Sequence, residues 1–126
     1  MVFKSNGKFL LTGEYLVLKG ATALALPLKK GQSLDVEILD SNEGIIHWDA
    51  FYKSTAQVQS SEFRVQSSNY HWFSAVLNKN DFSIKSTDDK EKAERLSDIL
   101  SKAKALNGNI FTELHDYKFT THLDFD

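Results

Sequence analysis

One segment with helical periodicity stands among segments that are otherwise strand-like, and this contrast most constrains the fold. Five apolar residues recur at helical spacing and form a single stripe: Leu96, Ile99, Leu100, Ala103 and Leu106. Asp88 and Glu91, three residues apart, resemble a capping box at the start of this segment. Asn107 and Gly108 form a suitable stop. The pattern predicts one long amphipathic helix over residues 88–106.

Most other segments have the pattern of β-strands. In residues 33–39, Leu34, Val36 and Ile38 alternate with polar residues, which is typical of a half-buried strand. Strands are also expected over residues 3–18 (two short strands with a turn near 12–13), 45–52 and 110–126. The 45–52 strand is expected to pair with the 33–39 strand across a hairpin loop at 40–44. Residues 21–28 suit a buried strand or a buried helix turn, followed by a turn at 29–31. Residues 70–77 suit a helix or a strand. Five or more strands with one helix predict an α+β fold.

Length and charge limit the classes of function. A chain of 126 residues fits a single domain, residues 1–126. Its net charge of −2 gives no bulk attraction for nucleic acid or an anionic membrane, and no apolar run is long enough for a membrane span. The absence of cysteine excludes disulfides and thiolate metal sites. We therefore expect a cytoplasmic protein with neither nucleic-acid nor membrane partners.

Residues 117–126 continue as a strand to the last position of the sequence, without a closing turn or polar tail. Tyr117, Phe119, Leu123 and Phe125 fall on one face of this strand. An unpaired edge here would favour self-association or strand exchange. The strand therefore supports an alternative function, a non-catalytic oligomerising or binding module.

The most informative stretch is residues 5–26, which read SNGKFLLTGEYLVLKGATALAL. It resembles the first signature of the GHMP kinases, the family of galactokinase, homoserine kinase, mevalonate kinase and phosphomevalonate kinase. That signature runs Pro-Gly-Lys, apolar residues, Gly-Glu, Tyr or His, an apolar run, Gly and an Ala-rich strand. The spacing from Gly7-Lys8 to Gly13-Glu14 is the same here.

The resemblance implies the N-terminal part of a longer two-domain kinase. The implied fold is ribosomal protein S5 domain 2-like, with a mixed or antiparallel sheet and one long helix. The implied activity is transfer of the γ-phosphoryl group of ATP, with Mg²⁺, to a hydroxyl or phosphate of a small metabolite. The motif is closest in character to mevalonate and phosphomevalonate kinases.

The resemblance also assigns site residues. Lys8 is the implied catalytic cation beside the acceptor hydroxyl, although it could instead be an exposed strand lysine. Glu14 is implied to bind substrate or to orient Lys8, with a solvated turn carboxylate as the alternative. Tyr15 is implied to line the substrate pocket, with core packing as the alternative. Gly13 would permit close backbone approach, or would only serve the turn.

Two departures from the family pattern matter. Asn6 replaces the Pro that precedes Gly-Lys, which puts the rigidity of that turn in doubt. The second signature, a Gly- and Ser-rich loop whose N–H groups hold nucleotide phosphates, is missing, because none of the six glycines are clustered. We therefore expect the residues that bind ATP and Mg²⁺ to lie mostly outside this chain. The chain alone would then be inactive, or a pseudo-kinase.

The remaining signals are weaker. The four histidines, His47, His71, His115 and His122, include no pair spaced for one face of a helix. His122 and Asp124 share a strand face but would make an under-coordinated metal site, so we expect no metal. Trp48 and Trp72 could stack on an adenine or a substrate, or could pack in the core. A Ser–His–Asp triad has no nucleophile-elbow motif to support it.

Overall fold

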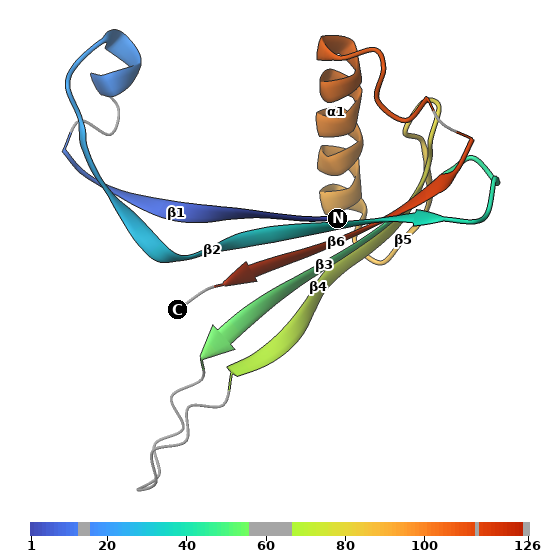
Figure 1. Cartoon of the computed structure of the whole chain (residues 1–126), viewed down its shortest axis with the longest axis horizontal. Coiled ribbons are helices and arrows are strands. Elements are labelled where there is room, and N and C mark those ends of the chain that lie inside the picture. Colours follow the sequence, from blue (N-terminus) through green and yellow to red (C-terminus); the bar gives the residue numbers. More distant parts are fainter. Residues whose placement is uncertain (13–15, 56–66, 113, 125–126) are drawn as a thin grey trace, which may run out of the picture.

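The computed structural model of the protein describes residues 1–12, 16–55, 67–112 and 114–124 (Figure 1). Within them lie eight elements, in this order along the chain: β1 (Val2–Thr12), the 3₁₀ helix η1 (Leu16–Lys19), β2 (Leu24–Leu39), β3 (Ile45–Thr55), β4 (Ser67–Asn78), β5 (Ile84–Thr87), α1 (Lys90–Leu106) and β6 (Asp116–Asp124). The α+β class is confirmed, with one mixed sheet and one α-helix in the described part.

The six strands form a single sheet in the order β1-β2-β6-β3-β4-β5. Every neighbouring pair is antiparallel except β3 and β6, which are parallel. The expectation of an unpaired edge at residues 117–126 is wrong for the described strand, because β6 pairs with β2 on one side and with β3 on the other. Residues 125 and 126 lie outside the described part of the chain. The sheet edges are β1 and β5.

Three local predictions also need correction. The turn expected at residues 29–31 lies inside β2, which runs continuously from Leu24 to Leu39. The first strand is one long element, β1, where two short strands were expected, and η1 takes the place of the second. The segments 33–39 and 45–52 are both strands but are not neighbours, since β6 lies between them. Residues 70–77 belong to β4, which settles that open choice as a strand.

The helix α1 covers one face of the sheet at one end only. It packs against β4 and β5, while the β1–β2 hairpin extends away from it (Figure 1). The buried core lies under α1 and comprises Ile46, Ala50, Phe73, Ala75, Leu77, Phe82, Ala93, Leu96, Leu100, Tyr117 and Phe119. The opposite face carries alternate residues of the same strands, among them His47, Asp49 and Lys118. One face is therefore apolar and the other polar, as in sheets that meet water on one side.

Both ends of α1 agree with the sequence prediction, except that the N-cap is one residue later than expected. Asp89, and not Asp88, is the N-cap, because its carboxylate accepts a hydrogen bond from the Lys92 N–H at 3.1 Å. The Asp88 carboxylate instead accepts from the Ser74 N–H at 2.8 Å, which ties the helix start to β4. Asn107 is the C-cap, as predicted. The apolar stripe is only partly covered: Ile99 is 61% exposed and Leu106 is 90% exposed.

Asp116, the first residue of β6, holds the loop that connects β2 to β3. Its buried carboxylate accepts hydrogen bonds from the Ser41 hydroxyl at 2.7 Å and from the N–H groups of Glu43 and Ile45 at 2.9 Å each. Burial alone raises the pKa of Asp116, but these donated hydrogen bonds outweigh it and lower the pKa to about 2. The charged carboxylate therefore holds the loop in place.

No helix in the described residues is both long enough and apolar enough to cross a membrane.

Candidate functional site

Lys8 lies on β1, directly after an irregularity in the pairing between β1 and β2. Asn6 pairs with Gly31 and Lys8 pairs with Pro27, so β2 contributes two more residues than β1 between these two pairs. Lys8 is exposed, and no ion pair or hydrogen bond joins its ammonium group to another described residue. Such irregularities re-aim side chains at strand edges. The implied catalytic cation is thus left without an intramolecular counter-ion in the described chain.

Gly13, Glu14 and Tyr15 lie outside the described residues. The structure therefore does not place the acid and the ring of the motif relative to Lys8. It does place the two flanks of the motif: β1 ends at Thr12, and η1 begins at Leu16. The strand that follows, β2, pairs back along β1, so the described residues of the motif that belong to β1 and β2 form the two arms of an edge hairpin.

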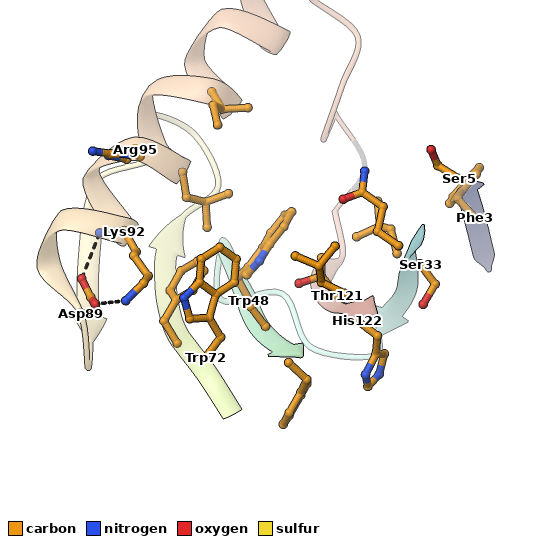
Figure 2. Close-up of a pocket in the computed structure, with 18 of the residues that line it drawn as sticks. Phe3, Ser5, Ser33, Trp48, Trp72, Asp89, Lys92, Arg95, Thr121 and His122 are labelled. Carbon is orange, nitrogen blue, oxygen red and sulfur yellow. Dashed lines mark hydrogen bonds and ion pairs between the residues drawn. The ribbon is translucent and has the colours of Figure 1, made fainter. Parts of the chain in front are cut away.

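One large concavity in the described residues, which we call the aromatic groove, has a volume of about 740 Å³. It lies between α1 and the apolar face of the sheet (Figure 2). Its apolar walls are Phe3, Leu34, Trp48, Ala50, Phe51, Trp72, Phe73, Leu96, Ile99 and Leu123. Lys8 is not among the residues that line it. The groove is therefore separate from the site that the motif implies.

The two tryptophans lie differently in the aromatic groove. Trp48 is half-buried and stacks on the core residue Phe119, with ring centroids 5.1 Å apart. Trp72 is 47% exposed, and its edge-to-face contact with Phe73 has a centroid distance of 5.7 Å. Figure 2 shows both rings between the helix and the sheet. Trp48 thus packs against the core, whereas Trp72 presents its ring to the groove.

The charged groups at the rim of the aromatic groove are paired along α1. Lys92 forms an ion pair with Asp89, and its ammonium group also lies 5.8 Å from the Trp72 ring centroid (Figure 2). Arg95 donates to Glu91 at 2.8 Å. Each of these two helix cations therefore has a carboxylate partner one helical turn away, so the α1 side of the groove offers little net charge to an ionic ligand.

A second concavity, which we call the polar hollow, lies next to the aromatic groove and shares five lining residues with it: Lys4, Ser5, Gln32, Ser33 and His122. Its volume is about 400 Å³, and its lining residues are Lys4, Ser5, Asn6, Lys29, Gly31, Gln32, Ser33, Lys53, Asn69, His122 and Asp124. The sequence pointed to His122 and Asp124 as strand neighbours but gave no signal for the lysines, which come from three strands distant in the chain. Pairing between those strands is what gathers them.

The histidines do not form a metal centre in the described part of the chain. No three His, Cys, Asp or Glu side chains there are grouped closely enough to hold an ion. His71 lies 3.5 Å from the Asp88 carboxylate. The backbone carbonyl of His115 accepts from the Lys79 ammonium at 2.8 Å. No described serine hydroxyl is hydrogen-bonded to a histidine ring, so a Ser–His–Asp triad has no support among these residues.

No protein-family model, no curated protein and no solved structure matches this chain. The resemblance to the GHMP kinases therefore depends on the order and spacing of residues 5–26.

Proposed function

We propose that this chain supplies the acceptor-binding part of a small-molecule kinase of the GHMP type. One observation carries the proposal: the ordered run from Gly7-Lys8 through Gly13-Glu14 to the Ala-rich segment in residues 21–26. A run of this length with preserved spacing is far more specific than an isolated glycine motif. The ribosomal protein S5 domain 2-like fold is part of the same proposal, and a mixed sheet with one α-helix is compatible with it.

In this proposal Lys8 acts on the phosphate acceptor. A compact ammonium group beside the attacking hydroxyl favours its deprotonation and offsets the charge that develops during phosphoryl transfer. Support comes from the exposure of Lys8 and from its lack of a described ionic partner, which leave the ammonium group available to a ligand. Glu14 and Tyr15 complete the acceptor side, and Gly13 allows the acceptor to approach the backbone.

The described residues do not fit the other substrate, Mg-ATP. They contain no glycine-rich loop before a helix, and they contain no cluster of acidic side chains for a cation. In our proposal the nucleotide is therefore held by residues other than these. The chain by itself binds the acceptor but does not transfer a phosphoryl group.

Calorimetric titration with homoserine, galactose, mevalonate and phosphomevalonate tests the acceptor site. We expect one of them to bind to the isolated chain and the Lys8→Met variant to weaken that binding about tenfold, the loss of one charge-assisted contact. Lys85→Met is the matched control, because Lys85 lies on β5 at the opposite sheet edge and should leave binding unchanged. ATP should give neither binding nor turnover.

Two results would contradict the proposal. Equal affinity of the wild-type chain and Lys8→Met for the bound acceptor would remove Lys8 from the site. Turnover of ATP and acceptor by the isolated chain, at a rate typical of kinases, would show that the nucleotide is held by residues that we have excluded.

A second candidate is a non-catalytic module that self-associates, and the exposed edge of β1 favours it. β1 has 11 residues and pairs only with β2, and its Val2, Phe3 and Phe9 side chains are each more than half exposed. A strand edge of this kind is a template for pairing with a second copy of the chain. Light scattering decides: a concentration-dependent dimer supports pairing along β1, and a monomer at all concentrations excludes it.

A further inference from the structure

We propose that the polar hollow is a binding site for the phosphate group of a small ligand, held by Lys4, Lys29 and Lys53 beside His122. This inference goes beyond the proposed kinase function and does not depend on it, because Lys8 does not line the polar hollow. It follows from strand pairing, from the charge balance and from the hydrogen-bonding groups around the hollow.

Strand pairing brings the lining residues to one face. Lys4 on β1 pairs with Ser33 on β2, and Ser33 pairs in turn with His122 on β6. Directly paired residues stand on the same face of a sheet with their Cβ atoms about 5 Å apart. These side chains therefore form one row across three strands.

A second row lies beside the first. Lys53 on β3 pairs with Asp124, which is two residues beyond His122 on β6 and so lies on the same face. Lys53 also pairs with Asn69 on β4, which closes this side of the polar hollow. Four strands thus deliver cationic and amide groups to one place.

The charge balance favours an anion. Three lysines line the polar hollow, against the single carboxylate of Asp124. That carboxylate lies 4.0 Å from the Lys53 ammonium, and both side chains are about half exposed. No described carboxylate pairs with Lys4 or Lys29. Two positive charges therefore remain uncompensated, which matches a phosphate dianion better than a monoanionic carboxylate.

Uncharged donors complete the polar hollow. Ser33 and Asn69 line it, and their side chains can donate to phosphate oxygens. The ring of His122 stacks on Phe51 at a centroid distance of 5.3 Å, and its buried Nδ1 atom has no hydrogen-bond partner. Buried polar atoms are usually hydrogen-bonded, so the unsatisfied Nδ1 atom of His122 is an exception among the residues that line the polar hollow.

The aromatic groove is the less suitable site for phosphate. Two of its cations, Lys92 and Arg95, are already paired with Asp89 and Glu91, most of its walls are apolar, and Lys4 is the one lysine that it shares with the polar hollow. The polar hollow has the opposite character, and its volume is within the range of sites for small molecules. The distribution of charge therefore favours the polar hollow over the aromatic groove as the phosphate site.

An NMR titration of the full chain with inorganic phosphate, at constant ionic strength, tests the inference. We expect saturable shifts confined to amides around Lys4, Ser33, Lys53 and His122. Each of the variants Lys4→Gln, Lys29→Gln and Lys53→Gln should weaken binding about three- to fivefold, the effect of one exposed charge pair. Methyl phosphate as a second probe shows whether a phosphate monoester binds as well as free phosphate.

Lys85→Gln is the control, because Lys85 lies on β5 at the other edge of the sheet, and it should leave the affinity for phosphate unchanged. Shifts that rise linearly without saturation would overturn the inference, as would an equal loss of affinity in the Lys85→Gln variant. Phosphate binding is read from amides around the polar hollow, whereas acceptor binding is read from calorimetry of Lys8→Met, so failure of this site and failure of the proposed acceptor site are distinguishable.

Discussion

Individual residues show how much of this fold depends on precise polar and steric contacts. Asp116 is fully buried, yet its carboxylate is charged because three donors from residues 41–45 converge on it. Nothing in the sequence around Asp116 sets it apart from the other acidic residues. Its role depends on β6 lying next to that loop, and this contact is between segments distant in the chain.

The Asp116→Asn variant should lose stability at neutral pH by about 1–3 kcal/mol, because an amide cannot accept all three hydrogen bonds. In the folded protein the pKa of Asp116 is about 2, which is below the ordinary aspartate pKa of 3.8. The carboxylate therefore stabilises the fold above about pH 4 and loses this contribution as the pH falls from 3.8 toward 2. Urea unfolding from pH 7 to pH 2.5 should show the difference between wild type and variant shrinking.

Asp98→Asn is the control for this pH series, since Asp98 is exposed on α1 and should change stability little. A difference between wild type and Asp116→Asn that stayed constant down to pH 2.5 would show that the charge of Asp116 is not what stabilises the loop.

Gly31 is a second residue that the fold requires, in this case for steric reasons. A Cβ atom at this position would lie 2.0 Å from the Ser5 carbonyl oxygen and 2.8 Å from the Asn6 Cα atom. Gly31→Ala should therefore push β1 away from β2 and destabilise the protein by about 1–3 kcal/mol. Gly108→Ala meets nothing within 4 Å and should be neutral in the same thermal unfolding experiment. Equal melting temperatures for the two variants would contradict the close approach.

At the scale of elements, the helix was predictable and its surroundings were not. The spacing of Leu96 and Leu100 identified α1, and both residues are buried. Ile99 belongs to the same sequence stripe but lines the open aromatic groove. Periodicity shows which face of a helix is apolar, whereas the width of the buried part depends on how much sheet the helix covers.

Two substitutions on neighbouring turns of α1 should separate these environments. Leu96→Ala should cost about 2–4 kcal/mol, because it leaves a cavity beneath the helix. Ile99→Ala should cost less than about 0.5 kcal/mol, since its side chain is largely exposed and alanine favours helix. Chemical denaturation of both variants measures the contrast. A comparable cost for Ile99→Ala would mean that another part of the protein or a partner covers the groove in solution.

The strands show a similar division between local and distant information. Alternation at Leu34, Val36 and Ile38 correctly indicated a strand, but Lys29, Lys30 and Gly31 looked like a turn and instead continue β2. Composition favours a turn there, and pairing with β1 overrides it. The motif around Lys8 is the part of the candidate site that could be predicted from the sequence. The polar hollow could not be predicted, because its lysines meet only through the strand order.

At the scale of the whole molecule, the sheet is unevenly supported. The strands β3, β4 and β6 contribute most of the buried core beneath α1, whereas almost every residue of β1 is exposed. The first residues of β2, from Leu24 to Lys29, are exposed as well. Local stability follows the density of buried contacts, so the two ends of the sheet should differ.

Amide hydrogen exchange should reveal this difference directly. We expect amides of β1 and of the Leu24–Lys29 part of β2 to exchange at least about tenfold faster than those of β3 and β6, because opening the hairpin exposes little apolar surface. The measurement is an exchange time course read by NMR or mass spectrometry. Uniform protection across all strands would contradict it and would indicate that a covering partner stabilises the hairpin.

The central place of β6 has a consequence for biosynthesis. The β1–β2 and β3–β4 hairpins can each form early, but only β6 joins them, through pairing with both β2 and β3. On the ribosome, the nascent chain therefore holds two separate hairpins until residues 116–124 have emerged. During that interval the strand edges of β2 and β3 that β6 later covers are unpaired, and such edges are prone to aggregation.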